Sequence, residues 1–174
     1  NIFDFLIKIN NFKFGEAVRT LASEAGMPAY RFTKQDEERD NRWKIYNSIL
    51  EKYVDFFNHE LTSKKNSEAY KYLENRKLNT EEINFFKIGY VPHDNNFYQT
   101  LNKEFTNEQL KSSGLYYFDE KKGQHVDRFK GRIIFPVKNL SGKFIALGGR
   151  SVSKNYFAKY INSPETEFYK KGNN

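Results

Sequence analysis

The stretch VDRFKGRIIFPVKNLSGKFIALGGR, residues 126–150, has the pattern of a β-hairpin. Residues 133–137 are a short apolar run of strand formers, and residues 144–147 form a second one. Between them, residues 139–142 have turn chemistry, with a Ser-Gly pair before a lysine. We therefore expect two antiparallel strands joined by a short turn, and we place the rest of the chain around this hairpin.

Positive charges flank the two predicted strands. Arg128, Lys130 and Arg132 alternate directly before the first strand, and Arg150 follows two glycines at the end of the second. Alternate side chains of a strand point to the same face, so this spacing predicts one row of three cations. Such a row would bind an anionic partner.

The charge of the chain is concentrated in the same region. Residues 121–174 hold 12 Lys and Arg against 3 Asp and Glu, a net charge of +9. Residues 1–120 hold 17 against 19, a net charge of −2. A basic segment of this kind favours a phosphate-rich partner. The alternative is a lysine-rich surface that is merely solvated.

The composition limits the kinds of site that the chain can form. Its 174 residues are enough for one domain with a core of its own, and 17 Phe and 12 Tyr can fill that core. Cysteine is absent, which excludes disulfides and thiolate metal ligands within the chain. No apolar run is long enough to span a bilayer, so we expect no membrane partner.

Apolar periodicity and capping signals predict the remaining elements. Helices are expected over residues 3–7, 14–25, 35–61, 68–75, 80–86, 96–104 and 107–114. Extended segments are expected over residues 88–92, 115–118 and 160–162. Ser163 and Pro164 fit either the start of a helix or a turn. The predicted fold class is α+β, with a helical N-terminal half packed with a small mixed or antiparallel β-sheet in the C-terminal half.

The sequence has no pattern of a self-contained active site. His59, His93 and His125 are scattered without metal-ligand spacing. A nucleophile elbow, a Walker A loop and a dinucleotide-binding glycine pattern are all absent. Paired carboxylates for Mg²⁺ are missing from the basic third, and Asp127 is better suited there to orienting arginines.

Some residues of the basic third have two interpretations each. Gly148 and Gly149 either give a strand end a flexible backbone or let a phosphate approach beside Arg150. Asn162 either contacts a sugar or phosphate or caps a loop. Four aromatic residues either stack on bases or pack under the hairpin; they are Tyr156, Phe157, Tyr160 and Tyr169.

Several ordered motifs resemble the catalytic core of bacterial replicative primases of the DnaG type. In this sequence they read DRFKGRIIFPV from Asp127, GGR from Gly148 and AKYINSPET from Ala158, and three later residues complete the match: Phe168, Lys171 and Gly172. Upstream, FGEAV from Phe14, YLENRKL from Tyr72 and IGYVP from Ile88 resemble further motifs of the family. The chain departs from the family pattern at Lys77 (for Gly), Ala146-Leu147 (for Gly-Phe) and Ala158 (for Pro).

The resemblance implies a domain organisation. Residues 1–26 would be the helical tail of a zinc-binding domain or a linker, and residues 27–174 the N-terminal subdomain of the polymerase core. The zinc ribbon would precede Asn1, and the metal-binding Toprim subdomain would follow Asn174. The implied cofactors are Zn²⁺ and either Mg²⁺ or Mn²⁺ in the full-length enzyme, with no metal held by this chain.

The resemblance also implies site residues by their positions in these motifs. Catalytic contacts to the nucleotide and to transition-state charge would come from Arg150, Lys159, Asn162 and Lys171. Contacts to the nucleic-acid backbone would come from Arg76, Arg128, Lys130, Arg132, Arg150 and Lys159. The implied chemistry is phosphodiester formation by two-metal catalysis.

The function that the resemblance implies is that of a DNA primase. This nucleotidyltransferase, a DNA-directed RNA polymerase, makes short RNA primers on single-stranded DNA during replication, in the bacterial cytoplasm at the nucleoid. Its partners would be the template, the RNA primer, nucleoside triphosphates and, through a C-terminal region outside this chain, the replicative helicase of the primosome. This chain would supply the basic wall of the active-site cleft and be inactive alone. The alternative is a non-catalytic single-stranded nucleic-acid-binding module of the same ancestry.

Overall fold

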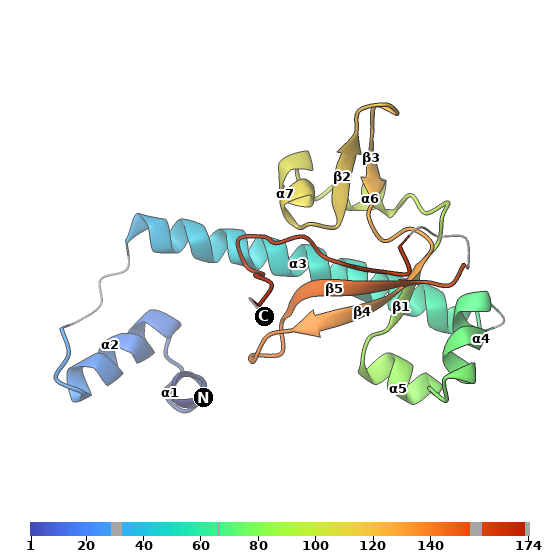
Figure 1. Ribbon diagram of the computed structural model, residues 1–174. Helices are drawn as coiled ribbons and strands as arrows, with labels where there is room; N and C mark the ends of the chain where they lie inside the picture. The colour runs from blue at the N-terminus through green and yellow to red at the C-terminus, as the bar shows by residue number, and fades with distance from the viewer. Residues whose placement is uncertain (29–32, 66, 154–157, 173–174) are drawn as a thin grey trace. The chain divides into compact units, whose positions relative to one another are not determined.

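The computed structural model describes residues 1–28, 33–65, 67–153 and 158–172. The chain divides into two compact units, Asn1–Arg42 and Trp43–Asn174. The boundary falls within one helix, α3 (Lys34–Ser63), which confirms the long helix predicted over residues 35–61. Figure 1 shows the elements and their labels.

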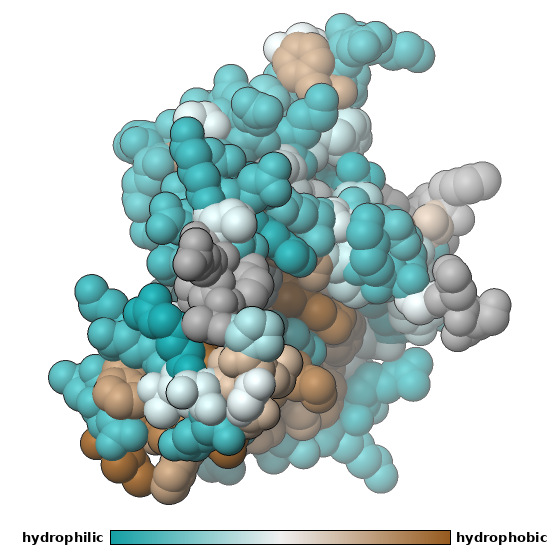
Figure 2. Space-filling model, turned by 90° about the vertical axis from the view of Figure 1, so that its left-hand side faces the viewer, coloured by the Kyte–Doolittle hydropathy of each residue, from teal (hydrophilic) through white to brown (hydrophobic). Residues whose placement is uncertain are grey.

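The first unit consists of helices α1 (Ile2–Asn10) and α2 (Phe14–Glu24) and the start of α3. The rings of Phe3 and Phe14 lie 5.7 Å apart between centroids and join α1 to α2. The opposite side of α1 leaves three apolar residues more than half exposed: Ile2, Phe5 and Ile9. Figure 2 shows a surface that is hydrophilic over most of its area, with some hydrophobic residues exposed.

The second unit is built on a four-stranded antiparallel sheet in the order β1-β4-β5-β6. Its strands are β1 (Gly89–Val91), β4 (Arg132–Lys138), β5 (Phe144–Ser151) and β6 (Tyr160–Asn162). β4 and β5 are the predicted hairpin, which is confirmed. The sheet together with the helices confirms the α+β fold class.

Helix α3 covers one face of this sheet (Figure 1). Ile134 and Leu147 on that face share a core cluster with Tyr53 and Phe57 of the helix. At the start of β5, Asn47 donates from Nδ2 to the carbonyl oxygen of Phe144 at 3.0 Å. Polar contacts from the helix to strand backbone therefore fix where β5 lies.

The other face of the sheet is covered over only part of its area. Helices α4 (Glu68–Asn75) and α5 (Thr80–Phe85) pack against Ile133, which is fully buried. Two residues further along β4, Phe135 is 36% exposed, and Val137 is 39% exposed. The sheet therefore keeps an open area beside the end that α4 and α5 cover.

The remaining elements form a smaller group. α6 (Phe97–Leu101) and α7 (Asn107–Ser112) precede a separate two-stranded hairpin of β2 (Tyr116–Asp119) and β3 (Gln124–Asp127). The sequence predicted only a turn after residue 118, so β3 is a correction. Across the described ranges, no helix combines the length and the apolar character needed to cross a membrane.

Gly89 lets β1 touch the backbone of α3 directly. A Cβ atom at this position would lie 2.8 Å from the carbonyl carbon of Phe57 and 2.9 Å from the backbone nitrogen of Asn58. These are backbone atoms of a buried helix, so they have little freedom to move away. Any side chain at position 89 would push β1 off the helix.

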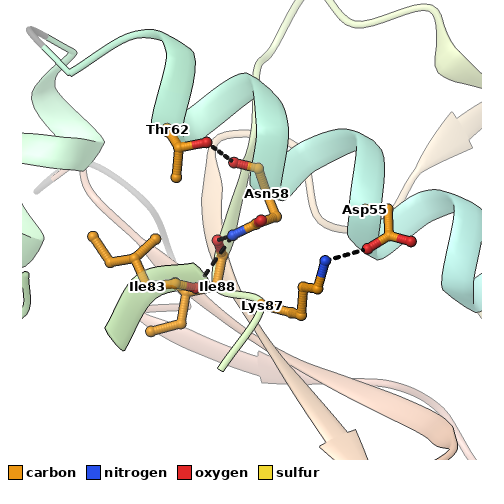
Figure 3. Close-up of polar contacts among 6 residues, drawn as sticks. All are labelled: Asp55, Asn58, Thr62, Ile83, Lys87 and Ile88. Carbon is orange, nitrogen blue, oxygen red and sulfur yellow. Dashed lines mark hydrogen bonds and ion pairs between the residues drawn. The ribbon is translucent and has the colours of Figure 1, made fainter. Parts of the chain in front are cut away.

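The side chain of Asn58 reinforces the same contact (Figure 3). From its buried place on α3, its Nδ2 donates to the carbonyl oxygens of Ile88 at 2.7 Å and Ile83 at 3.2 Å. One turn away, the Lys87 ammonium lies 2.8 Å from the Asp55 carboxylate. The end of α5 and the start of β1 are thus tied to α3 by a buried amide and an exposed ion pair.

The segment after β6 contains no helix in its described part, residues 163–172, so Ser163 and Pro164 do not start a helix. Ser163 donates from its backbone nitrogen to the carbonyl oxygen of Leu147 at 2.8 Å, and its Oγ accepts from Leu147 N at 2.9 Å. One residue therefore satisfies both backbone groups of Leu147 just beyond β6.

We expect Gly89→Ala to destabilise the chain by about 2–4 kcal/mol, because the new methyl group overlaps α3 backbone. Chemical unfolding followed by circular dichroism measures the loss. The matched control is Gly148→Ala in β5, where the nearest atom to a new Cβ is 3.5 Å away. That control should unfold within about 1 kcal/mol of the wild type. Equal stabilities of the two variants would contradict the role given to Gly89.

Candidate nucleic-acid interface

The guanidinium of Arg150, at the end of β5, makes contacts with two tyrosine rings. Its Cζ lies 4.1 Å from the ring centroid of Tyr72, on α4, and 5.6 Å from that of Tyr160, its partner in β6. Contacts of this kind orient a guanidinium without neutralising its charge. Tyr72 reaches Arg150 because α4 packs on the sheet at Ile133, the Cα partner of Arg150 in β4.

Two more cations lie over these rings. Arg76, at the C-terminal cap of α4, has its Cζ 5.5 Å from the Tyr72 ring centroid. The Lys159 ammonium lies 5.8 Å from the Tyr160 ring centroid. Both side chains are exposed. We call Tyr72, Arg76, Arg150, Lys159 and Tyr160 the Arg150 cluster; it joins three predicted site residues from distant parts of the sequence.

The Arg150 guanidinium has hydrogen-bond donors that no described residue uses. Its Nε and Nη1 are buried from solvent and have no hydrogen-bond acceptor among the described residues. A buried donor without an acceptor costs about 1–3 kcal/mol, so such groups are rare unless a ligand satisfies them. Phosphate and carboxylate oxygens accept two parallel N–H bonds from a guanidinium. The Arg150 cluster therefore has the charge and the donors to bind an anionic oxygen ligand.

The predicted row of Arg128, Lys130 and Arg132 is wrong. Residues 128–131 form a turn instead of a strand, with Gly131 at a φ of 68°. Phe129 inserts into the core from this turn and is fully buried. A turn does not alternate side chains between two faces, so the three cations do not line up.

Two of these three cations lie at quite different places. Arg128 donates from Nε to the carbonyl oxygen of Gly114 at 3.2 Å, and its Cζ lies 5.4 Å from the ring centroid of Tyr117 on β2. Arg132 is only 5% exposed, and its Nη1 donates to the carbonyl oxygen of Lys159 at 3.4 Å. Arg132 therefore supports the backbone of a cluster residue. The predicted nucleic-acid contacts of Arg128, Arg132 and the half-buried Lys130 stay predictions.

Asn162 and Lys171 differ in their relation to the cluster. Asn162 is exposed on β6 and pairs with Gly148, two residues along the strands from the pair of Arg150 and Tyr160. Lys171 is also exposed, but it follows a segment that leads to the other end of β5. There Thr166 donates from Oγ1 to the Tyr46 hydroxyl at 3.2 Å. The structure thus places Asn162 beside the Arg150 cluster and Lys171 outside it.

Tyr72 is the residue that the sequence did not reveal as part of the site. Its helical spacing predicted an inward-facing core residue, and it is indeed half-buried. Its contact with Arg150 joins two distant segments, and no local pattern reports such a contact. Of the aromatic candidates, Tyr160 is 64% exposed beside two cations, while Tyr156 and Phe157 lie outside the described residues.

A metal site is not formed by the part of the chain described. No three His, Asp or Glu side chains gather there in a way that could hold an ion. The residues present therefore do not fit the metals that the resemblance implies, and we assign no metal-dependent step to them.

Comparison with known proteins identifies the family. Residues 56–174 match the family model for the N-terminal domain of the DNA primase catalytic core. The chain belongs to this primase family. It is 35% identical over 175 residues to the DNA primase of Halalkalibacterium halodurans, and 36% identical over 174 residues to that of Thermotoga maritima. These alignments cover 99% and 98% of the chain but only 29% of each relative.

Solved primase structures share the fold. A DnaG primase catalytic domain bound to single-stranded DNA superposes with a TM-score of 0.66 and 28% identity, covering 75% of this chain and 41% of that one. The RNA polymerase domain of Mycobacterium tuberculosis primase in complex with double-stranded DNA gives a TM-score of 0.67 and 26% identity, over 73% and 41% of the two chains. The zinc-binding and RNA polymerase domains of Aquifex aeolicus primase give 0.65 and 25%, over 97% and 40%.

Asp127, from the DRF motif that resembles the primase pattern, is buried behind the turn of residues 128–131. Its carboxylate accepts hydrogen bonds from the Tyr53 hydroxyl at 2.8 and 2.9 Å and from Phe129 N at 2.8 Å. Burial raises the pKa of Asp127 to about 6, although these hydrogen bonds and the charge of Lys130 act in the opposite direction. Asp127 thus holds the backbone of the turn, where orientation of an arginine was expected.

The raised pKa of Asp127 predicts a pH-dependent stability. The folded protein binds this proton more tightly than the unfolded chain, whose carboxyl has the ordinary pKa of 3.8. The contribution is therefore fully present below about pH 4 and is lost as the pH rises through 6, by about 2–3 kcal/mol. Urea unfolding at steps from pH 4 to 8 should show this decline in the wild type. Asp127→Asn, which cannot ionise, should lack it; parallel pH curves for the two proteins would contradict the assignment.

Proposed function

We propose that this chain forms the template- and nucleotide-binding wall of a bacterial primase. The observation that carries the proposal is the Arg150 guanidinium, which is oriented by two tyrosines and whose buried Nε and Nη1 have no acceptor among the residues that the structure describes. A phosphate would satisfy these donors and would be further neutralised by Arg76 and Lys159. The net charge of +9 over residues 121–174 would attract a polyanion to the same region.

Related structures support nucleic acid as the anion. A DnaG primase catalytic domain has been solved with single-stranded DNA, and the M. tuberculosis polymerase domain with double-stranded DNA. By this likeness, the ligand of the Arg150 cluster is a phosphate of the single-stranded template or of an incoming nucleoside triphosphate. Tyr160, exposed beside Lys159 and Arg150, offers a ring face to a neighbouring base.

The whole enzyme would then be a nucleotidyltransferase that makes RNA primers on single-stranded DNA during replication. In that reaction, Arg150 and Lys159 would hold phosphate oxygens and neutralise the negative charge that develops as the phosphodiester forms. Arg132 would act as a positioning residue through its hydrogen bond to Lys159 O. Metal ions would supply Lewis-acid activation from a site outside these residues. Helicase binding would likewise belong to a part of the enzyme that this chain does not cover.

Arg150→Ala should weaken binding of a fluorescein-labelled oligothymidine to the chain about tenfold, because a charged bidentate contact is removed. It should also reduce the slope of log K against log salt by about 0.7, as expected for one phosphate contact on a single strand. Fluorescence anisotropy over a series of salt concentrations measures both values.

Two variants control this experiment. Arg150→Lys keeps the charge but loses the planar guanidinium, so it should retain the salt slope and bind more weakly than the wild type. Lys103→Ala removes one exposed positive charge from the turn after α6 and should leave both values near those of the wild type. Equal losses in Arg150→Ala and Lys103→Ala would show that only net charge matters and would contradict a specific site.

The chain alone should bind single-stranded DNA with a steep salt dependence but make no primers, because its described residues form no metal site. Incubation with template, radiolabelled nucleoside triphosphates and Mg²⁺ or Mn²⁺, followed by denaturing electrophoresis, tests this. Primer products from the chain alone would contradict the proposed division of labour. A complete protein that binds DNA but makes no primers would instead favour the non-catalytic binding module.

A further inference from the structure

Gly148 is a glycine that the fold itself does not require. Its φ lies outside the left-handed region, so its backbone is open to other residues. Among the described residues, a Cβ atom there would have Asn162 Oδ1 at 3.5 Å as its nearest neighbour and then Phe135 O at 3.9 Å, which is ordinary contact distance. Gly149 is different, because a Cβ there would lie 2.6 Å from Cδ1 of the buried Phe129. Packing thus explains the second glycine of the pair and leaves the first unexplained.

The surroundings of Gly148 form a continuous strip on the open area of the sheet. Phe135 on β4 and Asn162 on β6 are its Cα partners, so these two side chains flank it on the same face. Phe135 is 36% exposed, and Asn162 is exposed as well. We call Phe135, Gly148 and Asn162 the Gly148 strip: an aromatic ring, bare backbone and an amide, side by side.

The geometry of the strip indicates which ligand it suits. β5 is paired on both sides at Gly148, so its N–H and C=O lie in the plane of the sheet and do not form an amide nest for a phosphate. A flat ring can lie on the bare backbone where a side chain would hold it off. The amide of Asn162 can then donate to and accept from the polar edge of that ring. A nucleobase has this combination of a flat face and a polar edge.

The Arg150 cluster lies at a suitable distance for the phosphate of the same nucleotide. Gly148 and Arg150 are two residues apart on one face of β5, about 7 Å along the strand. One nucleotide can span this distance from its base to its phosphate. We therefore propose that the Gly148 strip seats the base of the nucleotide whose phosphate Arg150 binds, and that Gly148 lacks a side chain because the base occupies that space. This inference rests on the proposed function of the Arg150 cluster.

The test separates base contacts from phosphate contacts. The chain is titrated with two labelled oligomers of equal length, an oligothymidine and an abasic strand with the same phosphates. The wild type should prefer the oligothymidine. Gly148→Val should weaken oligothymidine binding about tenfold, as expected for one lost base contact, and leave abasic binding unchanged. Its melting temperature should stay close to that of the wild type, whereas Gly149→Ala should melt earlier.

Phe135→Ala provides a second variant, whose result does not depend on whether the sheet accommodates a valine side chain at position 148. It should also lose affinity for oligothymidine and keep affinity for the abasic strand. The inference would be overturned if a folded Gly148→Val or Phe135→Ala variant kept wild-type affinity for both oligomers. It would also be overturned if the wild type bound the two oligomers equally. The proposed phosphate site would stand after each of these results. A wild type that binds neither oligomer would overturn the proposed function and this inference with it.

Discussion

The direct contact of β1 with the backbone of α3 determines where the rest of the sheet lies. Gly89 allows it sterically, and Asn58 supplies the hydrogen bonds that a side chain at position 89 would displace. β1 pairs with β4, and β4 pairs with β5, so the position of Arg150 follows from this contact through two strand registers. At the far end, Asn47 ties β5 to the same helix. The charged site is therefore carried by a framework that is fixed at both ends.

Within this framework the Arg150 cluster is a compromise between stability and binding. A guanidinium whose buried donors find no acceptor in the described part of the chain is unfavourable for the free protein, and aromatic contacts recover only part of that free energy. Carboxylates could satisfy the donors, but they would also remove the positive charge that attracts an anion. Tyrosines hold the group in place and leave its charge available. Arg132 adds support from the inner face of the sheet without adding an exposed cation.

Local sequence patterns predicted the hairpin, the long helix and most of the shorter helices, because those elements follow from periodicity and turn chemistry within a few residues. They failed at residues 128–131, where the buried Phe129 and the hydrogen bonds of Asp127 replace a strand with a turn. They also failed at Tyr72, whose contact with Arg150 arises only when α4 packs on the sheet. Lys77 adopts a φ of 64°, so the turn after α4 forms without the glycine of the family pattern.

The short outer strands of the sheet have a consequence for its behaviour in crowded solution. Long unpaired strand edges recruit other chains and promote aggregation. Beyond the three residues of β1, the exposed edge of β4 contains Pro136, which has no N–H to donate. Beyond β6, Ser163 occupies both backbone groups of Leu147. Just beyond each outer strand, the edge of the sheet is thus closed to the addition of another strand. The open face of the sheet, and not its edges, is therefore available to a ligand.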